Sequence, residues 1–170
     1  MKTLLLLIGA LAMANLAVAQ VTIEMKNAQG QSVGAVKASP VSETTPMGVR
    51  FDFDLVNLPP GDHAVHIHAV GKCDAPGFTT AGGHFNPDHK QHGTDNPAGS
   101  HAGDLKNLTA DSEGKATATL TATKVSHKGD KDSIYSAQGT ALVIHAKADD
   151  YKSDPAGNAG DRIACGVIKP

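Results

Sequence analysis

Residues 49–56 read VRFDFDLV, and apolar and charged side chains alternate along this stretch. Side chains two positions apart on an extended strand point to the same face. The apolar side chains share one face: Val49, Phe51, Phe53 and Leu55. The charged side chains share the other: Arg50, Asp52 and Asp54. This pattern predicts an antiparallel strand with one face in a hydrophobic core and the other in solvent.

Other short stretches on both sides of this strand have a similar character. Pro59-Pro60-Gly61 ends it, and the period of two resumes in residues 63–70. Turn residues separate further candidate strands: 21–25, 33–37, 105–108, 116–123, 133–136, 141–144 and 162–168. The chain holds 18 Gly and 9 Pro, and no helical period or internal repeat follows residue 19. The sequence therefore predicts an all-β antiparallel sandwich or barrel of about eight strands.

Two long segments between these strands are polar and rich in turn residues. They span residues 71–103 and 148–160. A loop of the first length in a compact domain is either functional or disordered. Bound ligands would order it, so its histidines decide between the two interpretations.

The first nineteen residues have a composition of their own. A positive start at Lys2 precedes an apolar run over residues 4–16, and Ala17-Val18-Ala19 fits a small-residue cleavage site. This predicts a secretory signal peptide over residues 1–19 that is cleaved after Ala19, and one domain over residues 20–170. An uncleaved membrane anchor is the alternative, but the run is short for a span and no basic stop follows it.

Export also bears on the cysteines and on possible partners. Disulfides form in oxidising compartments, and with two cysteines the only pairing is Cys73–Cys165.

The net charge of the mature chain bears on its partners. Without Lys2 the chain has 14 basic and 17 acidic residues, a formal charge of −3. We therefore expect no nucleic-acid binding and no stable membrane association after cleavage.

Seven of the nine histidines lie between residues 61 and 104. His66 and His68 are two positions apart on one strand face, where two imidazoles can bind one metal, although a polar strand face shows such a pair by chance. The following loop offers three imidazoles and a carboxylate, which suit a tetrahedral zinc site: His84, His92, His101 and Asp104. A solvated histidine-rich loop is the alternative. His145 ends a run of apolar residues and is a candidate metal ligand only in combination with the other histidines.

Five motifs occur in order along nearly the whole mature chain. They are GDHAVHIH (61–68), GGHFNP (82–87), HAGDL (101–105), LVIHAKADD (142–150) and GNAGDRIACGVI (157–168). Together they resemble the copper–zinc superoxide dismutase family. The resemblance implies an eight-stranded antiparallel Greek-key β-barrel or sandwich with two long functional loops. It also implies one copper and one zinc per subunit, and dismutation of superoxide to dioxygen and hydrogen peroxide.

The resemblance assigns a role to individual residues. It implies copper ligands at His66, His68, His84 and His145. It implies zinc ligands at His84, His92, His101 and Asp104, with His84 bridging the metals and delivering a proton to the developing peroxide. Asp149 matches a carboxylate that links a copper histidine to a zinc histidine, and Arg162 matches the guanidinium that docks the substrate anion. Cys73 and Cys165 match the intradomain disulfide of the family.

Two departures from the eukaryotic cytosolic enzymes point to a bacterial branch. The segment between Cys73 and His84 is longer than in those enzymes, and the one between His145 and Arg162 is shorter. The resemblance is therefore to the secreted bacterial type, which implies the periplasm or, failing that, the extracellular space. It leaves open whether the protein is a monomer or a homodimer.

Rival functions exist on the same domain. A copper chaperone or storage module would be expected to lack a copper ligand or the arginine, and a zinc-only binding protein would lack His66, His68 or His145. All are present, so we expect an oxidoreductase with an antioxidant role. The remaining histidines have simpler interpretations: structural for His63, solvated for His89 and His127. The lysines that could steer superoxide are open guesses: Lys72, Lys90 and Lys152.

Overall fold

The computed structural model describes residues 20–42 and 44–169, so the predicted signal peptide at residues 1–19 lies outside the described residues. In the described part, nine strands and one 3₁₀ helix form. The strands are β1 (Val21–Asn27), β2 (Ser32–Pro40), β3 (Met47–Leu55), β4 (Gly61–His63), β5 (Val65–His68), β6 (Leu108–Ala110), β7 (Ala116–Ser126), β8 (Thr140–His145) and β9 (Arg162–Ile168). The 3₁₀ helix η1 spans Thr79–Ala81. No helix of this part is long and apolar enough to cross a membrane.

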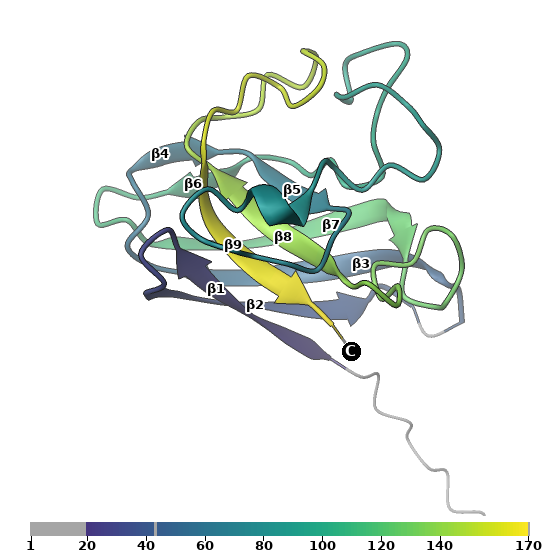
Figure 1. The fold of residues 1–170 in the computed structure, drawn as a ribbon, viewed down its shortest axis with the longest axis horizontal. Coiled ribbons are helices and arrows are strands. Elements are labelled where there is room, and N and C mark those ends of the chain that lie inside the picture. Colours follow the sequence, from purple (N-terminus) through teal and green to yellow (C-terminus); the bar gives the residue numbers. More distant parts are fainter. Residues whose placement is uncertain (1–19, 43, 170) are drawn as a thin grey trace, which may run out of the picture.

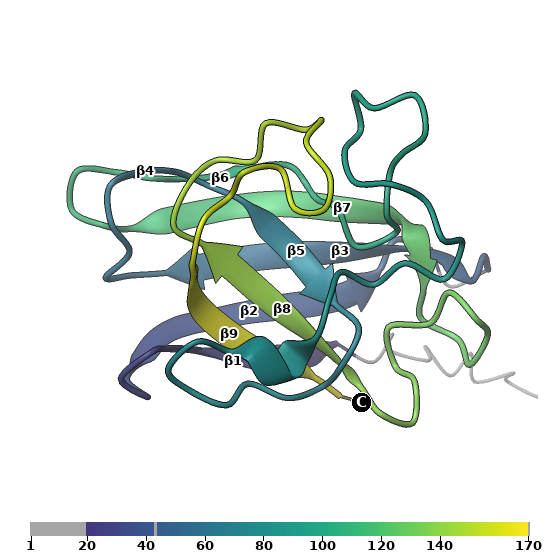
Figure 2. The same cartoon turned by 45° about the horizontal axis from the view of Figure 1, so that its top comes forward.

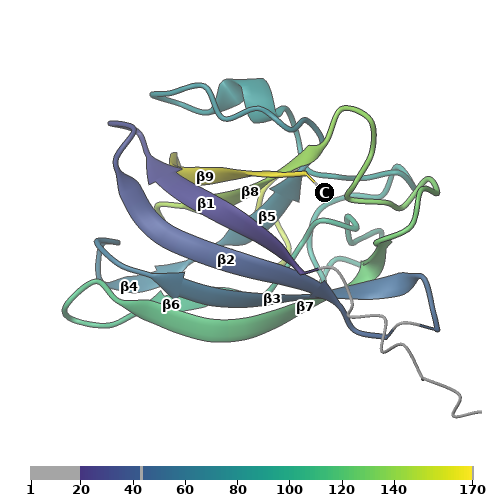
Figure 3. The same ribbon diagram turned by 90° about the horizontal axis from the view of Figure 1, so that it is seen from below.

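Seven strands form one antiparallel sheet in the order β5-β8-β9-β1-β2-β3-β7 (Figure 1). The sheet curls so that β5, β8 and β9 face β2, β3 and β7 across the core (Figure 3). β4 and β6 form a separate pair. Because β4 leads into β5 and β6 contacts β7, this pair lies between the two edges of the curled sheet. The all-β antiparallel architecture is confirmed, and it is consistent with a Greek-key barrel.

The alternation over residues 49–56 places β3 as expected. Its apolar side chains are buried in the core: Val49, Phe51, Phe53 and Leu55. Arg50 and Asp54 are exposed on the opposite face. Burying a Phe or Leu side chain of this kind contributes about 1.5–3 kcal/mol. The core between the two halves of the sheet therefore provides a rigid base for the loops.

Some predicted strands differ from those observed. Residues 133–136 form no strand but only an isolated bridge between Ser133 and Ser126 of β7. The following N–H groups of Tyr135 and Gly139 donate locally, to Ser133 Oγ and to the carbonyl of Ser136. The strand predicted at residues 105–108 begins only at Leu108. The one predicted at 63–70 is divided at Ala64, whose N–H donates to the carbonyl of Lys147.

The topology brings distant motifs together at one end of the barrel. β5 and β8 are neighbours in the register Val65↔Ile144, and β8 pairs with β9 up to His145↔Arg162. The two long connections are residues 69–107 and 146–161. In Figure 2 residues 146–161 and the later part of residues 69–107 extend at the top of the view, whereas the part with η1 lies in front of β1 and β9. The predicted disulfide is confirmed: Cys73 in the first connection is bonded to Cys165 on β9, with their Cα atoms 5.7 Å apart.

Candidate metal centre

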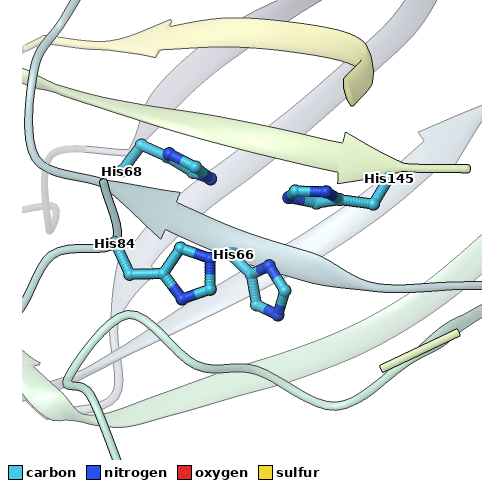
Figure 4. Close-up of side chains that lie close together, drawn as sticks. All are labelled: His66, His68, His84 and His145. Carbon is cyan, nitrogen blue, oxygen red and sulfur yellow. The ribbon is translucent and has the colours of Figure 1, made fainter. Parts of the chain in front are cut away.

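Four histidines from three elements form a first cluster (Figure 4). His66 and His68 project from β5, His145 ends the neighbouring β8, and His84 comes from the first long connection. One ring nitrogen of each lies within 4.8 Å of those of the other three. An antiparallel bridge between His68 and His84 fixes the connection against the end of β5. The structure thus unites the H-x-H pair with two histidines that its spacing alone did not reveal.

Hydrogen bonds fix the tautomer of three of these rings. The carbonyl of Gly82 accepts from Nδ1 of His68 at 2.9 Å, and that of Gly160 accepts from Nδ1 of His145 at 3.2 Å. Nε2 of His66 donates to Asp149 Oδ2 at 2.8 Å. A neutral imidazole carries one N–H, so in each ring the other nitrogen is left with a free lone pair.

These free nitrogens have no protein partner. Nδ1 of His66 and Nε2 of His68, His84 and His145 are buried and make no hydrogen bond within the described part of the chain. A buried polar atom without a partner costs about 1–3 kcal/mol. Four such lone pairs in one cluster fit a metal ion that accepts imidazole nitrogen, such as copper.

Burial keeps three of the four imidazoles neutral. It lowers the pKa of His68 to about 2, of His145 to about 3 and of His84 to about 4. Neighbouring imidazoles lower these pKa values further, since two positive rings at this distance would repel each other. At neutral pH these three rings therefore present lone pairs and not protons.

A second cluster surrounds the carboxylate of Asp104. Its Oδ1 lies 2.9 Å from Nδ1 of His84, 3.1 Å from Nδ1 of His92 and 3.2 Å from Nδ1 of His101. Nδ1 of His84 and of His101 are 3.1 Å apart. Ligands about 2.0 Å from a tetrahedral zinc ion lie about 3.3 Å from one another. Three imidazoles and one carboxylate at these separations fit zinc.

Asp104 is oriented by the backbone as well. Its Oδ2 accepts from the N–H groups of Gly93 and His101, which leaves Oδ1 facing the three imidazoles. Burial would raise the pKa of Asp104, but hydrogen bonds from the three histidines hold it well below its usual range. For His92 burial lowers the pKa, and hydrogen bonds to Asp104 and Asp149 raise it to about 9.

His66 also lies within 4.8 Å of ligand-type atoms of His84, His92 and Asp104. Its Nε2 is bonded to Asp149, however, and its only free nitrogen belongs to the first cluster. His101 Nδ1 lies 3.2 Å from Asp104, so His101 and not His66 completes the second cluster. His84 is the ring shared by both clusters, with Nδ1 in the second and Nε2 in the first.

Asp149 connects the two clusters from the opposite side. This buried carboxylate accepts from Nε2 of His66 through Oδ2 and from Nε2 of His92 through Oδ1, at 2.8 and 3.0 Å. The N–H of Tyr151 also donates to Oδ1, at 2.7 Å. A partner of this kind fixes the orientation of a ligating imidazole.

Arg162 lies where β9 begins, at the mouth of the first cluster. Its guanidinium donates to the carbonyls of Phe78 and Gly82, each at 2.7 Å. With His68, His84 and His145 it lines a pocket of about 450 Å³. An anion entering this pocket meets a fixed positive charge beside the free imidazole nitrogens.

The other histidines and the candidate lysines lie outside the clusters. His63 is buried, and its two ring nitrogens each lie 2.7 Å from a carbonyl oxygen, of His145 and of Pro59, as expected of a structural residue. His89 is exposed as predicted, whereas His127 is only partly exposed and its Nδ1 is buried. The three lysines are exposed and are not among the residues that line this pocket: Lys72, Lys90 and Lys152.

A sequence profile of the family described as copper/zinc superoxide dismutase (SODC) matches residues 32–168. The chain belongs to the copper/zinc superoxide dismutase family. Its cofactors are accordingly copper and zinc, and its reaction is the dismutation of superoxide, which makes it an oxidoreductase. The predicted family, cofactors and reaction are thus confirmed, whereas the roles of individual residues stay predictions.

Relatives of known family cover most of the chain. A Cu-Zn superoxide dismutase of Aquifex aeolicus (strain VF5) is 49% identical over 148 residues, 86% of this chain and 85% of that protein. The Escherichia coli (strain K12) Cu-Zn superoxide dismutase is 35% identical over 156 residues, 86% of this chain and 87% of that protein.

Solved structures agree with the fold. The Cu/Zn superoxide dismutase from Brucella abortus superposes with a TM-score of 0.68 at 31% identity, covering 89% of this chain and all of that one. A SOD-like protein from Bacillus subtilis superposes with a TM-score of 0.81 at 39% identity, covering 86% of this chain and 97% of that one.

Sequence reasoning missed residues that support the dismutase site from a distance. The sequence gives no reason to assign Asn107 to the site, yet its side chain makes hydrogen bonds with the main chain of Asp149. Asp154 accepts from the N–H of His92 at 2.6 Å. These partners are 42 and 62 residues apart in the chain, so no local pattern marks them.

Proposed function

We propose that this chain dismutes superoxide with copper bound by His66 Nδ1 and by Nε2 of His68, His84 and His145. Zinc is bound by Nδ1 of His84, His92 and His101 and by Asp104 Oδ1. The observation that carries the proposal is the set of four buried, unpartnered imidazole nitrogens that shares His84 with the carboxylate-centred cluster.

Copper, when bound, supplies the one-electron oxidation and reduction that dismutation requires. Two superoxide ions and two protons give one dioxygen and one hydrogen peroxide, so the chain must also deliver protons. His84 is the candidate donor, because it lines the pocket and its Nδ1 is engaged in the second cluster. The single lone pair of Nε2 can bind either copper or a proton, so Nε2 would hold a proton for the peroxide only while it is not a copper ligand.

Arg162 binds and orients the substrate anion. Two carbonyl oxygens hold the guanidinium in place, and the pocket that it lines is partly open to solvent. The formal charge of the mature chain is −3, so superoxide is repelled overall and must be attracted by local positive potential. Arg162 is the fixed cation at the site that supplies this potential.

Asp149 holds the geometry that the proton transfer needs. By accepting from both His66 and His92 it fixes one ring in each cluster. Asp104 fixes the third point, the Nδ1 side of His84, where zinc would also be held. The chain thus positions His84 without using the nitrogen that carries the proton.

The domain acts after export. The proposed signal peptide spans residues 1–19 and the mature domain residues 20–170. The disulfide Cys73–Cys165 supports an oxidising compartment, and the bacterial relatives favour the periplasm over the extracellular space. The mature protein acts as a monomer or a homodimer.

The proposed ligand set can be tested on the mature chain by measuring its metals together with its activity. The experiment is to purify residues 20–170, load them with copper and zinc, and measure both metal content and superoxide consumption. One copper and one zinc per chain with rapid consumption support the proposal. Copper binding without consumption would instead favour the chaperone or storage alternative.

A variant makes the test specific to the ligand set. Replacing His68 by Ala removes one proposed copper ligand, and replacing the exposed His89 by Ala removes a histidine outside both clusters. His68→Ala should lose copper and activity, while His89→Ala should behave as the parent. Equal behaviour of the two variants would contradict the assignment.

A further inference from the structure

We propose that Tyr151 is a positioning residue for the zinc cluster, and that it acts through its hydroxyl group on Asn107 and Asp149. This inference deepens the proposed function and depends on the zinc ligands assigned there. Tyr151 lies in the second long connection, two residues after Asp149. Neither its side chain nor that of Asn107 touches a proposed ligand directly in the described hydrogen-bond network.

Four hydrogen bonds close a ring through these three residues. The N–H of Asn107 donates to Tyr151 Oη at 2.9 Å. Nδ2 of Asn107 donates to the carbonyl of Asp149 at 3.0 Å, and the N–H of Asp149 donates to Asn107 Oδ1 at 2.8 Å. The N–H of Tyr151 donates to Asp149 Oδ1 at 2.7 Å. The ring fixes both the main chain and the carboxylate of Asp149.

The ring joins the ends of both long connections. Asn107 follows the proposed zinc ligand Asp104 by three positions in the first connection, and Asp149 belongs to the second connection. The carboxylate that the ring holds is the one that accepts from His92 and His66. A shift of Asn107 would therefore change the orientation of both imidazoles, those of His92 and His66.

Tyr151 holds the first connection by its backbone as well. Its carbonyl accepts from the N–H of Asp95 at 2.9 Å. A side chain at Gly93 would collide with that same carbonyl, so the two connections are in close backbone contact there. Tyr151 is fixed on both sides, which makes its hydroxyl a well-placed acceptor for Asn107.

The hydroxyl is the part of this arrangement that a substitution can remove cleanly. Tyr151→Phe keeps the aromatic ring and the hydrogen bonds of the Tyr151 main chain. It leaves the N–H of Asn107 without its acceptor, the hydroxyl oxygen. Tyr135→Phe is the matched control, because the Tyr135 hydroxyl is buried and has no partner in the described part of the chain. Both variants lose one hydroxyl, and only one of them loses a bond.

The experiment measures the rate at which zinc passes from the zinc-loaded mature protein to a chromophoric chelator at neutral pH. Loss of a group that orients a ligand typically weakens metal binding by about 10–100-fold. Tyr151 contacts the orienting residue Asp149 and not the ligand itself, so its effect should be at the lower end of this range. Zinc release should be about tenfold faster in Tyr151→Phe and unchanged in Tyr135→Phe. Release within twofold of the parent, or an equal change in both variants, overturns the proposal.

A purely structural role is tested in a second background. In Asn107→Ala the link from the hydroxyl to Asp149 is already broken, so adding Tyr151→Phe should have little further effect on zinc release. An undiminished effect in that background overturns the proposed route. As a further readout, the visible spectrum of Co²⁺ bound in place of zinc should change in Tyr151→Phe and not in Tyr135→Phe.

The outcomes separate this inference from the function it depends on. A parent protein that binds no zinc contradicts the ligand assignment. A parent that binds zinc tightly while Tyr151→Phe releases it at the parent rate contradicts only the role of Tyr151. If Tyr151→Phe does not fold, zinc release from Asn107→Ala decides, and a rate within twofold of the parent overturns the proposal.

Discussion

Arg162 and His68 donate hydrogen bonds to the same acceptor, the carbonyl oxygen of Gly82, at 2.7 and 2.9 Å. The proposed substrate anchor and a proposed copper ligand are therefore fixed to one peptide group. Gly82 lies at the end of η1, in the segment that the disulfide at Cys73 ties to β9. Substrate binding and ligand geometry thus depend on the same loop, and they can be separated by substitution.

Replacing Arg162 by Ala should lower the rate of superoxide consumption and leave copper content unchanged. His68 keeps its bond to Gly82 when the guanidinium is gone, so the ligand set stays in place. Local positive potential raises association rates by about 10–1,000-fold, and we expect a loss of at least about tenfold at low ionic strength. Stopped-flow measurement across a range of salt concentrations checks this.

Arg162→Lys is the companion variant. Lysine keeps the charge but lacks the fork that reaches both the Phe78 and Gly82 carbonyls. Its rate should fall between those of Arg162→Ala and the parent. Loss of copper in either variant would show that Arg162 serves the metal site and not the substrate.

Gly157→Ala should weaken zinc binding. Gly157 has a φ of +65°, and a Cβ there would overlap the Asp149 carboxylate and approach Nε2 of His92. The Asp149–His92 bond would have to open, and we expect an affinity loss of about 10–100-fold. Gly129→Ala is the control, because a Cβ at Gly129 meets nothing within 4 Å. Competition with a chelator should distinguish the two variants, and equal affinities would refute this reasoning.

Zinc binding to the metal-free protein should release a proton near pH 7. The pKa of His92 is raised to about 9 by Asp104 and Asp149, so this ring is protonated below that pH in the absence of metal. A zinc ligand must be deprotonated, and one proton per zinc therefore leaves from His92. This release should fade as the pH rises through about 9.

Calorimetry in buffers of different ionisation enthalpy measures that proton. The low pKa values of His68, His84 and His145 mean that these rings contribute none at neutral pH. A binding enthalpy that does not depend on the buffer at pH 7 would contradict the assignment of His92 as a protonated ligand precursor.

Removal of the disulfide should destabilise the metal-free protein substantially. Cys73 and Cys165 are 92 residues apart, and the chain-entropy estimate for a loop of this size is about 4–5 kcal/mol. Urea unfolding of a Cys73→Ser, Cys165→Ser double variant, compared with the oxidised parent, measures the difference. A free energy of unfolding within about 1 kcal/mol of the parent would be inconsistent with this estimate.

The sequence predicted the parts of the molecule that local patterns determine. Alternation over residues 49–56 identified β3 and its buried face, and the spacing of His66 and His68 identified two side chains on one face of β5. It failed at residues 133–136, where the pairing with β7 is limited to one bridge at Ser133 and local hydrogen bonds follow. It also could not place the break at Ala64, which depends on a bond to distant Lys147.

The site shows the same division. His145 joins His66 only because β5 and β8 pair, and their residues are far apart in the chain. Its assignment, like those of Asp149 and Arg162, came from family resemblance and not from spacing. Asn107 and Tyr151 gave no usable signal, because their bonds to Asp149 and to each other form only after both long connections fold.

The central claim is that two clusters bind different metals and share His84. Copper and zinc content of His145→Ala, measured beside superoxide consumption, tests it most directly, because His145 belongs to the first cluster alone. The account predicts that this variant keeps about one zinc per chain, loses copper and loses activity. Retention of copper with parent-like activity, or loss of zinc together with copper from a folded protein, would contradict it.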